Sequence, residues 1–224
     1  MIIRARLFVL VSFLSVSASV VFAQADSTSG KVASAKNFGI YGGASYSMLR
    51  LKSSPYFLNE SESLGNVSVA NSVGISGGIF LLFPSVQLRA AAEFNLMPCE
   101  LIYETGKPNQ EERMIYPLTV EIPISYLPPA IIKGKRSDLG LVFGGRFVFP
   151  ITIVGDDIPV VSSFNFNIDG GIRIPLRLTK SDASFELIYS YGVLNLIDKD
   201  EENFRNKSVQ TLGRDYIGLR LYFN

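Results

Sequence analysis

The sequence has no histidine and no tryptophan, and its only cysteine is Cys99. Without histidine the chain cannot form the Ser-His or Cys-His pairs of nucleophilic enzymes, and it lacks the commonest metal ligand in proteins. A single cysteine cannot form a disulfide within the chain, so Cys99 is expected to be a buried or loop thiol. We therefore expect no enzyme and no metal site. We also expect no cofactor and no small-molecule substrate.

A strong net charge is also missing. The 21 basic and 20 acidic residues leave a formal charge of +1, which gives no case for a nucleic-acid partner. Two acidic stretches, Asp156-Asp157 and DKDEEN (198–203), lack the ligand spacing of a calcium-binding loop. We interpret both as solvated loop acids.

Long apolar runs are confined to the first 23 residues, which have the pattern of a secretory signal peptide. Arg4 and Arg6 precede an apolar stretch, and the stretch ends at a small-residue cleavage pattern after Ala23, with Ala25 as a second candidate. This stretch is short for a bilayer span of about 20 residues, which disfavours an uncleaved anchor. Residues 24–36 are small and polar and predict a short disordered lead in the periplasm.

Residues 37–224 predict one all-β domain, because apolar and other residues alternate with period two. The alternating segments are about 10 residues long, the length of a transmembrane β-strand. We expect eight strands, whose apolar sets begin at Phe38, Val73, Val86, Leu118, Leu139, Phe164, Phe185 and Ile217.

The predicted connections differ in length from one end of the strands to the other. Pro84-Ser85 is a tight turn, 177–183 is short, and 127–137 is intermediate in length. The longer loops fall on the opposite side, at about 49–70, 98–113, 150–162 and 195–213. Outer-membrane barrels of bacteria have this asymmetry, with short periplasmic turns and longer extracellular loops.

Alternation alone leaves a soluble barrel open, in which the apolar face points inward. The lysines favour a membrane barrel, because all nine lie outside the predicted strands, whereas a water-facing sheet uses lysine freely. The polar faces carry small residues with four arginines and four carboxylates, and buried charges must be paired. We predict that these charges form a structural network in a filled lumen: Arg89, Glu93, Glu121, Arg146, Asp169, Arg173, Glu186 and Arg220.

The last strand shows both faces most clearly. Ile217, Leu219, Leu221 and Phe223 share one face, and Arg220 lies on the other. We predict that the first set faces lipid and that Arg220 faces the lumen. The predicted fold is therefore an eight-stranded antiparallel transmembrane β-barrel in the cell outer membrane, with outer-membrane lipid as its partner.

Two further segments are TVEIPISYL (119–127) and the C-terminal run 185–224, of which YSYGVLNLIDKDEENFRN is the more specific part. Both resemble the PorT family of outer-membrane proteins from Bacteroidetes, within a wider porin-like family of eight-stranded barrels. The resemblance implies an accessory or assembly component of type IX protein secretion, with other secretion-system membrane components as partners. It implies no catalytic residue and no cofactor. The alternative is a structural or adhesive porin-like barrel without a secretion role.

Overall fold

The computed structural model describes residues 37–54, 66–104, 110–114, 118–133, 138–151, 161–177, 182–197 and 208–223. Lys36–Asn224 forms one compact unit. The predicted signal peptide (1–23) and lead (24–36) lie outside the described residues. Within the described part of the chain, no helix has the length and apolar character needed to cross a membrane.

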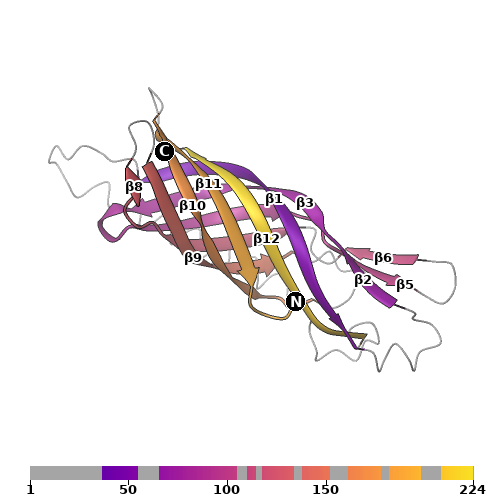
Figure 1. Cartoon of the computed structure of the whole chain (residues 1–224). Helices are drawn as coiled ribbons and strands as arrows, with labels where there is room; N and C mark the ends of the chain where they lie inside the picture. The colour runs from indigo at the N-terminus through magenta and orange to yellow at the C-terminus, as the bar shows by residue number, and fades with distance from the viewer. Residues whose placement is uncertain are drawn as a thin grey trace, which may run out of the picture. The chain divides into compact units, whose positions relative to one another are not determined.

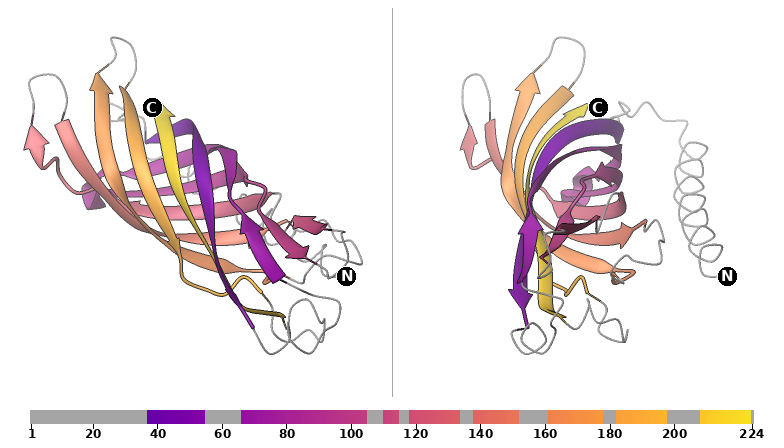
Figure 2. Two further views of the ribbon diagram at one scale, coloured as in Figure 1. Left: turned by 45° about the vertical axis from the view of Figure 1, so that its right-hand side comes forward. Right: turned by 90° about the vertical axis from the view of Figure 1, so that its right-hand side faces the viewer.

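Eight long strands form a closed antiparallel barrel, as the sequence predicts (Figures 1 and 2). Each strand pairs with the next one in the chain, and the first pairs with the last, with Ile40 opposite Phe223. The strands are β1 (Phe38–Ser53), β3 (Ser72–Phe83), β4 (Leu88–Leu96), β7 (Thr119–Tyr126), β9 (Asp138–Pro150), β10 (Asn165–Arg177), β11 (Asp182–Gly192) and β12 (Val209–Phe223).

The short connections lie together at one end of the barrel, here called the short-turn end. The turn between β3 and β4 is a 3-10 turn, Pro84–Val86, followed by Gln87 at a φ of 54°. Proline fixes its own φ, and the left-handed Gln87 completes the reversal. The prediction that Val86 begins a strand is therefore wrong. A second short connection includes β8 (Ile132–Lys133), which pairs with the start of β9.

A second sheet lies at the other end, here called the long-loop end, where the sequence predicted only loops. It consists of β2 (Asn66–Ala70), β5 (Glu100–Glu104) and β6 (Gln110–Met114). Strands β2 and β5 continue the pairing of β3 with β4 past a short irregular break, with Ala70 opposite Glu100. Two predicted loops, 49–70 and 98–113, are therefore partly strand, and β12 begins at Val209 inside a third.

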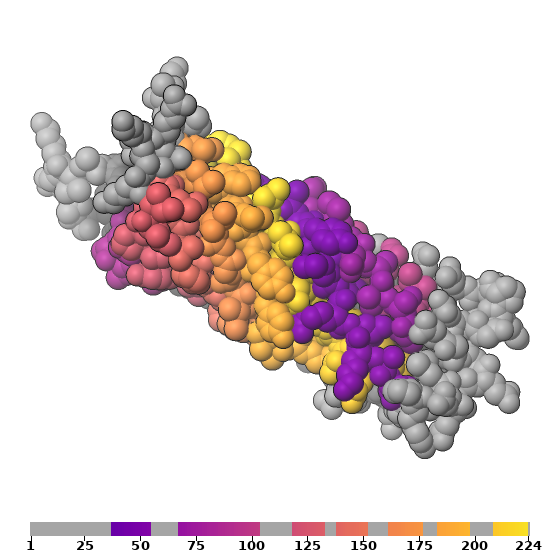
Figure 3. All heavy atoms as spheres, in the orientation of Figure 1, coloured from indigo at the N-terminus to yellow at the C-terminus, as the bar shows by residue number. Residues whose placement is uncertain are grey.

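The outer face of the barrel is apolar and open. Val73 and Ile75 on β3 are 68% and 64% exposed, and large exposed apolar residues occur on all eight strands. Ile217, Leu219, Leu221 and Phe223 alternate on the outer face of β12, which lies between β11 and β1 (Figure 3). A continuous apolar outer face of this kind belongs to a barrel surrounded by lipid.

Apolar clusters fill the interior at both ends of the barrel. At the short-turn end, Tyr41 stacks on Tyr222 at 4.6 Å between ring centroids, and Phe80 meets Tyr222 edge-on at 5.3 Å. Ala91 belongs to the same cluster. The larger cluster at the long-loop end combines residues of β1, β2, β5 and β12 with the connections beside them: Leu49, Val67, Cys99, Leu101, Tyr103, Val161, Leu196, Ile197, Val209 and Leu212.

Some glycines in the barrel wall have no room for a side chain. A Cβ at Gly78 would collide with the carbonyl oxygen of Ala92 and approach Glu93 Cα to 3.0 Å. The backbone of β4 therefore passes directly over Gly78, on the inner side of β3. A narrow barrel needs such positions, because each strand must coil closely around the next.

Candidate functional site

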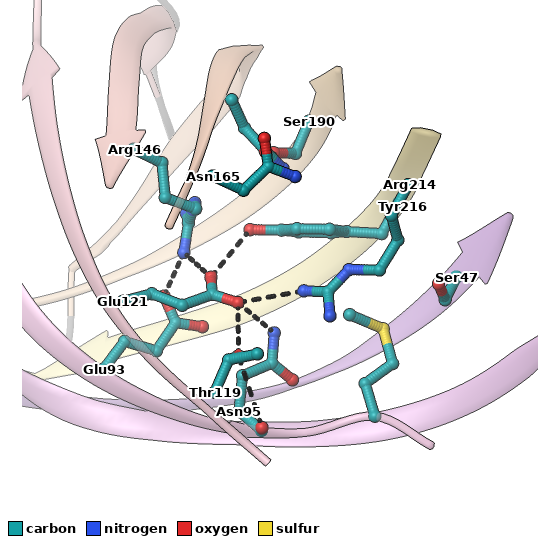
Figure 4. A network of polar contacts seen from close by, with 12 residues as sticks. Ser47, Glu93, Asn95, Thr119, Glu121, Arg146, Asn165, Ser190, Arg214 and Tyr216 are labelled. Carbon is teal, nitrogen blue, oxygen red and sulfur yellow. Dashed lines mark hydrogen bonds and ion pairs between the residues drawn. The ribbon is translucent and has the colours of Figure 1, made fainter. Parts of the chain in front are cut away.

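Arg146 on β9 is the centre of a polar network in the middle of the lumen (Figure 4). Its guanidinium donates to Glu93 on β4, to Glu121 on β7 at 2.7 Å, and to Asp169 on β10 at 2.8 and 3.0 Å. Arg146 and its three partners are all buried. The period of two places each of them on the inner face of its strand, so one cation joins four consecutive strands around the barrel.

Glu121 also receives donors from across the lumen. Arg214 and Tyr216 on β12 donate to it at 3.1 and 3.4 Å (Figure 4). Strands β7 and β12 are four places apart in the ring of eight, so these contacts span the full width of the barrel. The Thr119 hydroxyl and the Asn95 amide also donate to the Glu121 carboxylate, at 2.7 and 3.3 Å. The carboxylate thus has a donor on both walls of the lumen.

Glu93 links the central network to the C-terminal strand. Arg220 on β12 donates to its second oxygen at 2.9 Å and also reaches the Tyr216 hydroxyl at 3.1 Å. The Tyr41 hydroxyl donates to Glu93 at 3.0 Å. Because Tyr41 also belongs to the aromatic cluster at the short-turn end, the charged layer and that cluster are joined directly.

A second ion-pair centre lies nearer the short-turn end. Arg89 on β4 makes a bidentate pair with Glu186 on β11 at 2.6 and 2.8 Å. These two strands are also four places apart in the ring, so this pair crosses the lumen as well. Arg173 approaches Glu186 at 3.7 Å, and the Arg89 guanidinium lies 4.0 Å from the Tyr222 ring centroid. The planar, bidentate geometry is the strongest form of such a pair.

The structure places all eight residues of the predicted charge network inside the barrel and brings them together in these two centres. Seven are buried, and Arg173 is partly exposed. Arg214 was missed because the last apolar set was predicted only from Ile217, although Arg214 follows the inward alternation of Tyr216 and Arg220. With it, these inward residues are five arginines and four carboxylates.

The carboxylates of the network also accept hydrogen bonds from uncharged side chains. Ser190, for example, donates to Asp169 at 2.7 Å. Cys99 is buried, with the Ser47 hydroxyl 3.2 Å from its sulfur. Among the described residues, no group of three or more His, Cys, Asp or Glu side chains could hold a metal ion. The two acidic stretches at 156–157 and 198–203 lie outside the described residues.

The closed strand ring, the apolar outer face and the charge-filled interior define an eight-stranded transmembrane β-barrel with a packed lumen. No protein-family model matches the sequence, and the search of curated proteins gave no match.

Comparison with solved structures gave low similarities. The outer membrane protein OprG from Pseudomonas aeruginosa aligns with a TM-score of 0.42 and 10% identity, over 83% of this chain and 91% of that one. The enduracididine biosynthesis enzyme MppR, complexed with pyruvate, aligns with a TM-score of 0.20 and 9% identity, over 88% of this chain and 92% of that one. An acetoacetate decarboxylase-like enzyme from Sphingomonas wittichii RW1 aligns with a TM-score of 0.17 and 12% identity, over 82% of this chain and 90% of that one. These similarities are too low to support a conclusion about this chain. The barrel is therefore identified from the strand pairing of this chain alone.

Proposed function

We propose that this chain resides in a bacterial outer membrane and acts through its surfaces, as neither an open pore nor an enzyme. The observation that carries this proposal is the filling of the lumen. Ion pairs that cross the barrel, Arg89–Glu186 and Arg214–Glu121, lie between apolar clusters at the two ends. An eight-stranded barrel has interior space for side chains and little more.

Membrane residence can be tested directly. The mature chain should stay with the membrane fraction after alkaline carbonate extraction. It should also run faster on gels when unboiled than when boiled, as compact barrels do. Recovery as a folded monomer in the soluble fraction would refute the proposal.

Within the outer membrane, we propose a role as an accessory or assembly component of type IX protein secretion. The support is the resemblance of residues 119–127 and 185–224 to the PorT family. A barrel that neither conducts nor catalyses acts by contact, which suits an accessory component. Deletion of the gene should trap type IX cargo in the periplasm while leaving the permeability of the outer membrane unchanged.

A structural or adhesive barrel is the second candidate, and the sheet β2-β5-β6 favours it. This sheet continues the pairing of β3 with β4 beyond the barrel wall and gives the long-loop end an ordered surface. If the deletion strain secretes normally and loses only adhesion or envelope integrity, the secretion role is wrong and this candidate stands.

A further inference from the structure

On the outer face of the barrel, the Arg50 side chain of β1 crosses β12 and reaches β11. Its Nε lies 2.9 Å from an Asp215 oxygen, and its two terminal nitrogens donate to the Gly192 carbonyl at 2.6 Å and the Tyr191 hydroxyl at 3.1 Å. Arg50 is opposite Gly213 in the register, and a Cβ there would come within 2.8 Å of the guanidinium. The absence of a side chain at Gly213 is what lets Arg50 lie flat across the strand.

Asp215 holds this arginine in place. It alternates with Ile217 on the outer face of β12, yet it is only 4% exposed. The Tyr189 hydroxyl and the Gly192 amide donate to its two oxygens at 3.1 and 3.0 Å. The Arg50 guanidinium also lies 4.2 Å from the Tyr191 ring centroid. Paired charges and tyrosines on the outside of a barrel belong at the boundary between hydrocarbon and headgroups, not in the hydrocarbon itself.

A groove of about 380 Å³ lies beside this cluster, toward the long-loop end. Arg50 and Lys52, which share the outer face of β1, line one side of it. Gly213 and Thr211 of β12 form the part between, and 193–195 lines the other side. Lys52 is thus in a strand, against the expectation that the strands contain no lysine. Since Val193 and Leu194 are exposed apolar residues, the groove is cationic on one side and apolar on the other.

We propose that this groove binds a phosphate-bearing anionic lipid of the surrounding leaflet, with the lipid phosphate against Arg50 and Lys52. Asp215 offsets one of the two positive charges, so this side of the groove keeps a net positive charge. A guanidinium has five N–H donors, and the three contacts described use only three of them. Val193 and Leu194 then contact the first methylenes of its acyl chains. The groove opens beside the lipid-facing residues of β1 and β12, which puts it within reach of a membrane lipid.

This inference rests on the proposed membrane residence and is independent of any role in secretion. The test uses the full mature chain in detergent micelles that contain phosphatidylglycerol or phosphatidylcholine at equal mole fraction, with retained lipid counted by native mass spectrometry. The native protein should retain phosphatidylglycerol in preference to phosphatidylcholine. Lys52→Ala should weaken phosphatidylglycerol binding about fivefold, the factor that one basic side chain near an anionic surface supplies.

Two further variants separate a specific groove from general charge. Thr211→Glu places an acid opposite Lys52 in the register and should abolish the preference, whereas Lys133→Ala, in β8 at the short-turn end, should leave it unchanged. Heat modifiability on gels shows that each variant is folded. The proposal is wrong if the native chain does not distinguish the two lipids, or if Lys133→Ala weakens binding as much as Lys52→Ala.

Discussion

Arg146 donates to carboxylates from three strands and has no exposed side-chain surface. We predict that Arg146→Leu lowers the free energy of unfolding by at least about 3–5 kcal/mol, because it leaves buried carboxylates without their shared partner. Arg173→Leu is the control. The native Arg173 side chain is 26% exposed and lies 3.7 Å from Glu186, so its loss should lower the free energy of unfolding far less. Unfolding in urea, followed by circular dichroism, measures both. Equal losses would mean that the central network is not what stabilises the lumen.

Gly77 and Gly78 are adjacent residues that test the tightness of the barrel wall. A Cβ at Gly78 would meet the backbone of β4, whereas the nearest atom to a Cβ at Gly77 is 3.6 Å away. Gly78→Ala should destabilise the barrel by about 1–3 kcal/mol, the usual cost of overpacking. Gly77→Ala should be neutral or should stabilise by up to about 1 kcal/mol. Thermal unfolding measures the stability of the two variants. If neither alanine lowers the stability, β3 and β4 can separate at this point.

At the scale of the element, β12 carries an apolar outer face that ends before Thr211. Leu219→Arg should make the free energy of folding into lipid vesicles less favourable by roughly 2–4 kcal/mol, because a charge would face the hydrocarbon. Thr211 lies on the same face nearer the long-loop end. Thr211→Arg should therefore change the free energy of folding by at most about 1 kcal/mol. Folded fractions can be read from heat modifiability. A reversed order of the two variants would contradict the assignment of the lipid-facing band.

The strands could be predicted from sequence because their two faces meet different surroundings. Alternation separates Leu219 from Arg220 whichever strands lie beside them. The same signal cannot show that Arg89 meets Glu186, since that contact depends on strands far apart in the chain. Sheet β2-β5-β6 was missed for a related reason. At the long-loop end one face is no longer in lipid, so the pattern weakens while the backbone pairing continues.

For the whole molecule, the packed interior predicts an electrically silent protein. Purified chain added to a planar bilayer should insert without producing steady conductance. The charged layer and the two apolar clusters together leave no wide aqueous path in the described part of the lumen. A porin of known conductance, prepared in the same detergent, is the positive control. Stable channel openings by the native chain would overturn the proposal that it acts only through its surfaces.

Orientation is a second property of the whole molecule. Ser163→Cys lies at the long-loop end and Ser85→Cys at the short-turn end, and both positions are exposed. In intact cells, an impermeant thiol reagent should label the first variant and leave the second unlabelled. The native thiol gives little background because Cys99 is buried. Labelling of Ser85→Cys alone would mean that the barrel is inserted the other way round.

The ion pairs that cross the lumen also constrain how the barrel can be made. The hairpin β3-β4, if it entered the bilayer alone, would carry Arg89 and Glu93 into lipid before their partners on β9, β11 and β12 arrived, and each unpaired charge would oppose insertion. A slip of one residue in β12 would turn Arg220 outward and Leu219 inward, so the wrong register is penalised at the same moment. Only the complete ring pairs every charge. The network thus makes assembly nearly all-or-none, so that a partly built or misregistered barrel is not a stable resident of the membrane.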